Sequence, residues 1–272
     1  MSTDRHRFGS GQAPATVSDD LWGPLRTLTD ARIGLARSGA SLSTPALLAF
    51  RLAHARARDA VSAEQDAPAL QSELAALGQA AIECTSAAPD LRTYLLRPDL
   101  GRALDPDSLA RLRTERGDAD LSIVLVDGLS ARAVQQHALP LLRVLLPLLD
   151  AAAWTLSPMV ILRHGRVAAG DVVGEALRAK CVLVLIGERP GLSSPDSMGA
   201  YMTWAPAPGV SDADRNCVSN IRPAGLSAAL AAQKLMYLLG RMRTLSASGV
   251  ALKDEMSPQI SETNPRAIDD YE

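Results

Sequence analysis

The chain is organised around residues 181–197, where CVLVLIG (181–187) is followed by ERPGLSSPDS (188–197). The apolar run from Cys181 to Ile186 has the length and β-branched content of a strand buried on both faces, as in parallel sheets. Pro190 and the glycines beside it prevent a helix from starting directly afterwards, and the serines add short hydroxyl groups. Because loops at the carboxyl ends of strands bind ligands in open α/β sheets, we expect a binding loop here.

Strands and helices alternate on both sides of this stretch. Further apolar runs predict strands at residues 121–126, 158–163 and 200–205, and helical spacing predicts helices after Ser130 and over residues 171–178 and 227–245. This alternation is typical of an α/β domain. We therefore predict a Rossmann-like parallel sheet with right-handed crossovers, flanked by helices, over residues 118–254.

The chain before this domain reads differently. Residues 21–117 are expected to form a helical N-terminal region, with helices over residues 44–61, from Pro68 and from Asp105. Residues 1–20 are expected to be a flexible lead without a secretion signal, and residues 255–272 a polar tail.

Composition excludes several classes of protein. The 272 residues are 47% hydrophobic, so they can bury a large core, and a net charge of -2 with 3% aromatic residues disfavours nucleic-acid binding. The longest apolar stretch, residues 139–154, is interrupted by two prolines and two charges, so no membrane span is expected. Cys84, Cys181 and Cys217 form no CxxC pair, which favours a cytoplasmic protein with free thiols.

Motifs for several common chemistries are incomplete. GLSAR (128–132) resembles half of the nucleophile elbow of serine hydrolases, but Arg132 stands where the second glycine belongs, so Ser130 is interpreted as a helix N-cap. No G-x-G-x-x-G follows the early strands, which leaves a dinucleotide site unsupported. The histidines and cysteines lack metal-ligand spacing, so no metal site is expected.

Two polar segments, residues 187–197 and 211–223, remain as candidates for binding. We expect both to be loops that project from one edge of the sheet. Their Asp, Asn and Ser residues are also common in ordinary turns. Two long polar loops at one edge nevertheless suit a large neutral ligand edged with amides, so a non-catalytic small-molecule-binding module is the alternative to an enzyme subunit.

A family resemblance joins these segments. The second half of the chain contains the runs DGLSARAV (127–134), GERPGL (187–192), RNCVSNIR (215–222) and SGVAL (248–252). The first half contains ARIGL (31–35), LAHARARDAV (52–61) and YLLRPDLG (94–101). Together these runs resemble the small (light) subunit of ethanolamine ammonia-lyase. The resemblance spans residues 21–254.

The resemblance implies an adenosylcobalamin-dependent lyase that converts ethanolamine to acetaldehyde and ammonia by radical chemistry. It implies a larger barrel subunit that holds the substrate, with cobalamin at the interface, and no catalytic residue in this chain. Carried over by motif, the cobalamin contacts are Val167, Glu188 and Cys217. Because no Asp-x-His-x-x-Gly run exists, the cofactor is expected to keep its own lower base. A bacterial microcompartment is the alternative to a free cytoplasmic location.

Overall fold

The computed structural model describes residues 22–35 and 37–256, so most of the predicted tail and the whole predicted lead lie outside the described residues. The described chain forms two compact units that divide after Leu48. The first unit contains α1 (Gly23–Arg26), the antiparallel pair β1 (Arg37–Ser38) and β2 (Ser41–Leu42), and the start of α2 (Thr44–Ser62). The second unit, which carries every candidate site residue, is described from here on.

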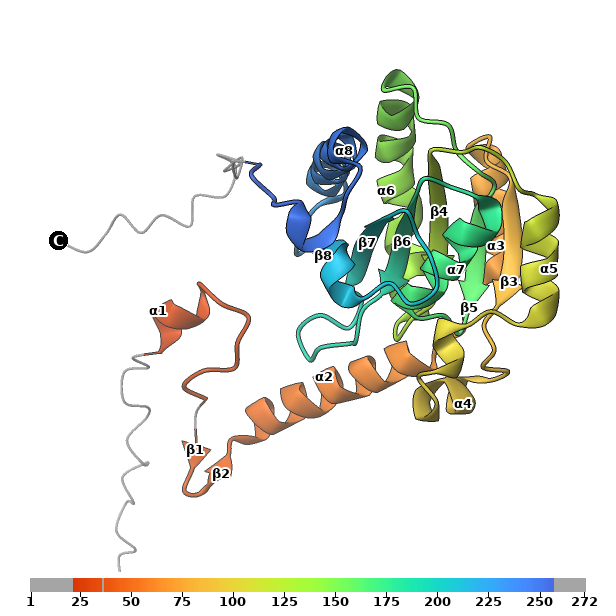
Figure 1. Ribbon diagram of the computed structural model, residues 1–272. Helices are drawn as coiled ribbons and strands as arrows, with labels where there is room; N and C mark the ends of the chain where they lie inside the picture. Colours follow the sequence, from red (N-terminus) through yellow and green to blue (C-terminus); the bar gives the residue numbers. More distant parts are fainter. Residues whose placement is uncertain (1–21, 36, 257–272) are drawn as a thin grey trace, which may run out of the picture. The chain divides into compact units, whose positions relative to one another are not determined.

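The second unit is built on one six-stranded sheet with the order β3-β5-β4-β6-β7-β8 (Figure 1). Its strands are β3 (Ala81–Thr85), β4 (Leu121–Val126), β5 (Met159–Arg163), β6 (Cys181–Gly187), β7 (Met198–Trp204) and β8 (Arg215–Ile221). The first four strands in this order are parallel, whereas β7 and β8 are antiparallel to their neighbours. The α/β class is thus confirmed, and the prediction of a parallel sheet throughout is wrong.

The connection between β6 and β7 explains the change of direction. Residues 188–197 contain no helix, and a parallel return needs a crossover of a dozen or more residues. The chain therefore turns back at once, so that Gly187 pairs with Met198 and Cys181 with Trp204.

Two strands of the six-stranded sheet, β3 and β8, were not predicted. β8 lies within residues 211–223, for which we expected a loop, because two asparagines and a serine give this segment low β propensity. Asn216 fits the strand since its amide donates to the carbonyl of Leu252 at 2.9 Å and its side-chain oxygen accepts the Gly249 N–H at 2.7 Å. β3 lies within the region expected to be helical, and it joins the sheet by parallel pairing with β5.

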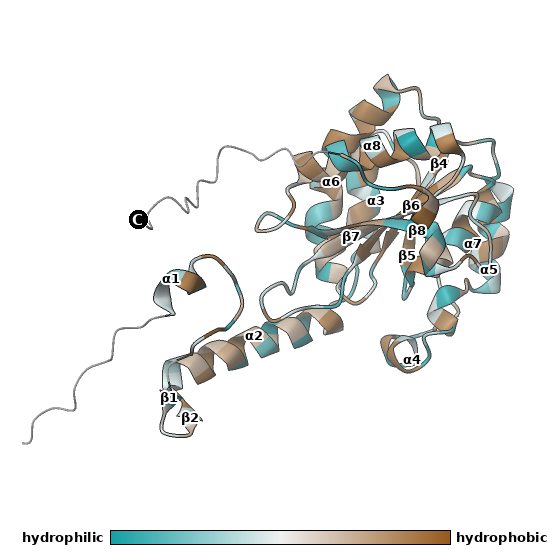
Figure 2. Cartoon of the chain, turned by 60° about the vertical axis from the view of Figure 1, so that its left-hand side comes forward, coloured by the Kyte–Doolittle hydropathy of each residue, from teal (hydrophilic) through white to brown (hydrophobic). Residues whose placement is uncertain are grey.

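Helices cover both faces of the sheet. One face carries α3 (Ala67–Ala76), α6 (Ala131–Ala151) and α8 (Ala228–Leu245), whose buried side chains share a core with the strands. The other face carries α5 (Pro106–Thr114) and α7 (Val167–Leu177) over a second core. The central strands are mostly hydrophobic in Figure 2, which agrees with the complete burial of β4 and β6. The remaining short elements are α4 (Leu91–Leu96), η1 (Leu100–Arg102), η2 (Asp212–Asp214) and η3 (Gly249–Ala251).

Capping side chains start most of these helices where the sequence indicates. Asp66 accepts the Ala69 N–H at 3.0 Å at the start of α3, and Ser227 accepts the Leu230 N–H at 3.4 Å at the start of α8. Ser130 occupies the N-cap position of α6, but its hydroxyl donates instead to the Pro195 carbonyl at 3.1 Å. No helix among the described residues is long and apolar enough to cross a membrane.

Asp120 lies directly before β4, where its carboxylate joins segments at the amino end of this strand. Its carboxylate lies 2.9 Å from the Lys180 ammonium and 3.1 Å from the Arg243 guanidinium, and it accepts the Thr155 N–H at 3.1 Å. Partial burial favours the neutral acid, but the hydrogen bonds from Lys180 and Thr155 outweigh this effect and lower the pKa of Asp120.

Candidate functional site

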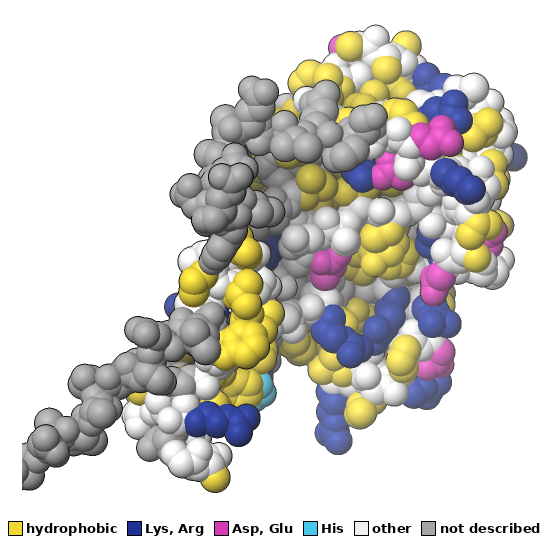
Figure 3. Space-filling model, turned by 90° about the vertical axis from the view of Figure 1, so that its left-hand side faces the viewer, with side chains coloured by type: hydrophobic (Ala, Val, Ile, Leu, Met, Phe, Trp, Pro, Cys, Tyr) yellow, Lys and Arg dark blue, Asp and Glu magenta, His cyan; other side chains and the backbone are white. Residues whose placement is uncertain are grey.

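The candidate site lies at the carboxyl ends of β4, β5 and β6 and on the neighbouring strands β7 and β8. These parallel strands finish at Val126, Arg163 and Gly187, so the segments that follow them are brought together. Figure 3 shows a face of the molecule on which Lys and Arg side chains of the second unit are interspersed with Asp and Glu.

Asp127, directly after β4, ties two of these segments together. Its carboxylate accepts the N–H groups of Gly128 at 2.8 Å, His164 at 2.7 Å and Gly165 at 3.2 Å. Burial raises the pKa of Asp127, and these hydrogen bonds oppose the rise. Because the Asp127 carboxylate oxygens already accept these main-chain N–H groups, we interpret Asp127 as a structural residue that holds the ends of β4 and β5 together.

The turn after β4 passes very close to the end of β6. Gly128 has a φ of +59°, and a Cβ placed on it would lie 2.4 Å from the Gly187 carbonyl oxygen. A Cβ on Gly187 would in turn lie 2.1 Å from the Ser130 carbonyl oxygen. Glycine is required at both positions, and this close crossing positions the residue after Gly187.

That residue is Glu188, the first of the three predicted cofactor contacts. Its N–H donates to the Ser197 carbonyl at 2.9 Å, and the Ser197 hydroxyl donates to its carboxylate. Glu188 is half-buried. A Cβ on Gly199 would lie 2.9 Å from a carboxylate oxygen of Glu188, so the missing side chain there leaves room for this carboxylate.

Cys217, the second predicted contact, is joined to Glu188 by a residue that the sequence analysis did not single out. Tyr201 on β7 pairs with Cys217 on β8, and the phenol and the thiol are close enough that each shifts the pKa of the other. A Cβ on Gly199 would lie 3.1 Å from the Tyr201 ring, which places this ring on the same side of β7 as the Glu188 carboxylate. The structure therefore groups Glu188, Tyr201 and Cys217.

The thiol and the phenol are both held in their neutral forms. Cys217 is exposed as a residue, yet burial of the thiol among its neighbours raises its pKa above the ordinary 9.0. Nearby Glu188 acts in the same direction, and the neighbouring Tyr201 phenol opposes both effects. Burial likewise raises the pKa of Tyr201. The cluster thus places an uncharged thiol and an uncharged phenol beside the Glu188 side chain.

Val167, the third predicted contact, is the first residue of α7, which therefore begins four residues earlier than predicted. The helix follows β5, so its N-terminus lies at the same sheet edge as Glu188. Val167 is half-buried, and it packs with Tyr201 against the second core. Val167 shares this face with the cluster, whereas Glu188 and Cys217 are linked to each other through Tyr201.

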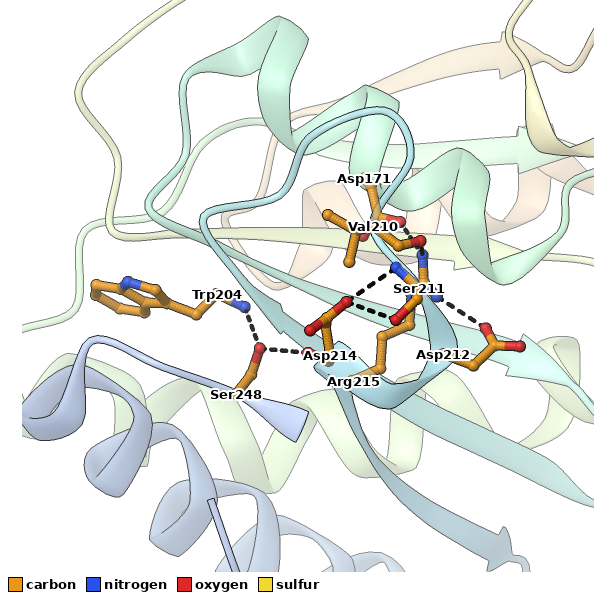
Figure 4. A network of polar contacts seen from close by, with 8 residues as sticks. All are labelled: Asp171, Trp204, Val210, Ser211, Asp212, Asp214, Arg215 and Ser248. Carbon is orange, nitrogen blue, oxygen red and sulfur yellow. Dashed lines mark hydrogen bonds and ion pairs between the residues drawn. The ribbon is translucent and has the colours of Figure 1, made fainter. Parts of the chain in front are cut away.

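A buried ion pair fastens the strand that carries Cys217 (Figure 4). Arg215 on β8 bonds Asp171 on α7, and both side chains are almost completely buried, at 3% and 2% exposed. Arg215 also donates to the Val210 carbonyl at 2.9 Å and to the exposed Asp212 at 2.8 Å. Burial raises the pKa of Asp171, while the bond from Arg215 favours its ionised form. The pair pins the edge strand to a core helix.

Alternation along β7 was the signal that could have identified Tyr201. Gly199, Tyr201 and Thr203 occupy alternate positions and so share one face, opposite Met198, Ala200 and Met202, which belong to the first core. The hydrolase motif gains no such support, because Ser130 is buried and its hydroxyl is bonded to a carbonyl. Among the described residues, no group of three or more His, Cys, Asp or Glu side chains could hold a metal ion.

Comparisons with known proteins match nearly the whole chain to one family of sequences. A family model described as "Ethanolamine ammonia-lyase light chain (EutC)" matches residues 19–253. A protein of Azotobacter vinelandii named "Ethanolamine ammonia-lyase small subunit" is 54% identical over 250 residues, covering 90% of this chain and 92% of the relative. Proteins of the same name from Pseudomonas aeruginosa and Ralstonia nicotianae are 51% and 49% identical, covering 92% and 93% of this chain and 93% and 95% of the relatives.

Proposed function

This chain belongs to the ethanolamine ammonia-lyase light chain family, and from this premise we propose that it supplies part of an adenosylcobalamin site. The enzyme would convert ethanolamine to acetaldehyde and ammonia by radical chemistry. Its relatives are named small subunits, which implies a larger partner. We assign the substrate pocket to this partner, a barrel subunit, and we place the complex in the cytoplasm or in a bacterial microcompartment.

The observation that carries the cofactor proposal is the grouping of Glu188, Tyr201 and Cys217 at the end of the sheet that α7 leaves uncovered. Helix α7 packs on β4 and β6, while Cys217 on β8 is exposed. A broad, flat molecule held from its other side by a partner subunit fits such a face. The periphery of cobalamin carries neutral amides, whose N–H groups match the single carboxylate of the cluster.

Each of the three predicted contacts would bind in its own way. Glu188 would accept amide N–H groups in charge-assisted hydrogen bonds, with its carboxylate oriented by Ser197. Cys217 would bind as a neutral thiol, and Val167 through close packing at the start of α7. Bound cobalamin would supply a cobalt–carbon bond that can break homolytically, and this chain would hold and shield the cofactor.

The proposal is tested by expressing the chain together with its large subunit and titrating the complex with adenosylcobalamin. We expect ethanolamine-dependent acetaldehyde formation by the complex, and none by this chain alone. Glu188→Ala removes charge-assisted hydrogen bonds worth about 1.5–3 kcal/mol, so cobalamin affinity should fall roughly 10- to 100-fold.

Glu175→Ala is the matched control, since Glu175 is an exposed carboxylate on α7. It should leave cobalamin affinity unchanged. Glu188→Gln keeps the shape and one acceptor oxygen, so its affinity should lie between those of the wild type and Glu188→Ala. Wild-type affinity in Glu188→Ala would remove Glu188 from the site, and the absence of cobalamin-dependent turnover in the complex would refute the function.

A further inference from the structure

Helix α2 is 19 residues long, yet the rest of its unit leaves it almost uncovered. Only Ala53 and Ala60 are buried among its residues. From Ala49 onward the helix belongs to the second unit, and no other described helix or strand of that unit packs along it. Helices in proteins gain most of their stability from packing of an apolar face. The second unit does not provide such packing for α2.

The first half of α2 exposes large apolar side chains on opposite sides. Leu48 and Leu52 are four residues apart, so they share one side of the helix, and they are 57% and 52% exposed. Phe50 lies about 200° around the helix from Leu48. It is 39% exposed, and its ring stacks on His54 with the ring centroids 6.4 Å apart. A helix that is apolar on opposite sides is typical of one that is enclosed rather than covered by a flat surface.

The helix also carries an excess of positive charge. Arg51, Arg56 and Arg58 are exposed, and Asp59 is the single acidic residue of α2, so the helix has a net charge of +2 (three arginines less one aspartate). Asp59 lies 3.7 Å from Arg58, whereas Arg51 and Arg56 have no acidic partner among the described residues. Two copies of α2 side by side would repel each other. Charge complementarity instead favours a surface with acidic side chains.

The large subunit that the proposed function requires is the partner that fits these features. We propose that the first half of α2 inserts into an apolar groove of the large subunit, with Phe50 and Leu52 against opposite walls and Arg51 and Arg56 at an acidic rim. Enclosing an amphipathic or apolar helix in a groove is a common mode of protein recognition. The inference rests on the proposed function for the existence of this partner, but it does not depend on the cobalamin site.

Substitutions on α2 test the insertion. The chain is co-expressed with a tagged large subunit, the complex is purified without cobalamin, and its dissociation constant is measured by mass photometry over a dilution series. Phe50→Glu and Leu52→Glu should each weaken the complex at least about tenfold, because each loses apolar contact and places a carboxylate inside the groove. Glutamate is a good helix former, so α2 itself should persist, which circular dichroism checks.

Two controls separate this surface from the rest of the chain. Val144→Glu introduces the same group on α6, at a valine that is 38% exposed, and should leave the dissociation constant unchanged. Glu188→Ala should also leave it unchanged, because the measurement is made without cobalamin. Arg56→Gln should weaken the complex at low salt, and this difference from wild type should shrink at high salt as the charges are screened.

Each contrary result overturns a defined part of the inference. Wild-type affinity in both glutamate variants would exclude α2 from the interface, and the intact complex would leave the proposed function standing. Loss in only one of them would replace the enclosing groove by a flat surface. An equal loss in Val144→Glu would remove the assignment to α2, and wild-type affinity of Arg56→Gln at low salt would remove the acidic rim. Self-association of this chain alone that both glutamate variants abolish would make the occupant a second copy. Failure of the wild-type chain to bind the large subunit would overturn both this inference and the proposed function.

Discussion

Replacing Asp171 with alanine should destabilise the chain by about 3 kcal/mol. Removing one member of a buried ion pair typically costs about 3–5 kcal/mol, because the other charge is left buried without compensation. Both side chains are nearly inaccessible to water. The lower end of the range applies because Arg215 keeps its bonds to Val210 and to Asp212. For a chain of this size the loss corresponds to a melting temperature roughly 6–12 °C lower.

Thermal and urea unfolding, followed by tryptophan fluorescence, measure this loss. Asp212→Ala is the matched control, since it removes the other acidic partner of Arg215, whose side chain is 99% exposed. It should cost no more than about 1 kcal/mol. The double variant Asp171→Ala/Arg215→Ala should lose less stability than the sum of the two single variants.

The same substitution should reach the candidate site. Cys217 follows Arg215 by two residues on β8, so releasing this edge strand from α7 should speed alkylation of the Cys217 thiol by iodoacetamide. If Asp171→Ala is no less stable than Asp212→Ala, the buried pair does not hold β8. The assignment of the strand's rigidity to this pair would then be refuted.

Three other perturbations have defined outcomes. Asp120→Asn should lower the free energy of unfolding by about 1 kcal/mol at pH 7. Because folding lowers the pKa of Asp120 from 3.8, its stabilisation is present above that value and is lost as the pH falls through the lower folded pKa. A difference from wild type in urea unfolding that persisted in strong acid would contradict this reasoning. Gly128→Ala should lower stability by more than about 1 kcal/mol, because Gly128 has a positive φ and the new Cβ would lie 2.4 Å from the Gly187 carbonyl oxygen. Gly117→Ala is the control, since the space around Gly117 is open. Equal losses in the two variants would exclude the close approach of Gly128 to Gly187 as the cause. Tyr201→Phe should move the alkylation midpoint of Cys217 to higher pH, since the neighbouring phenol lowers the pKa of the thiol. The other two thiols are buried, and an unchanged midpoint would refute this effect of the phenol.

Much of the core could be predicted from local pattern alone. β4 and β6 are continuous apolar runs whose side chains are all buried, so hydrophobicity identifies them. The long helices have caps or prolines at their starts, and α3, α5 and α8 begin within one or two residues of the predicted positions. Such elements carry their own signal because burial and capping act within a few residues.

The edges of the sheet depend on contacts that local sequence does not reveal. β3 has one fully buried residue, Cys84, and it is held by pairing with β5 far along the chain. β8 carries the polar Asn216, whose side-chain amide bonds main-chain groups of Gly249, more than 30 residues along the chain. The candidate site shows the same division. Glu188 and Cys217 were predicted from family motifs, whereas alternation along β7 gives only the face on which Tyr201 lies, and its place beside Cys217 depends on the pairing of β7 with β8.

At the end of the 188–197 loop, two neighbouring side chains face opposite sides of the sheet. Ser197 bonds Glu188, and its neighbour Asp196 lies 3.6 Å from His137 on α6. Consecutive side chains of one backbone segment therefore report on opposite sides of the sheet. An isotope label on the Ser197 amide would therefore sense changes on either side, and random mutagenesis of this segment should seldom alter one side without disturbing the other.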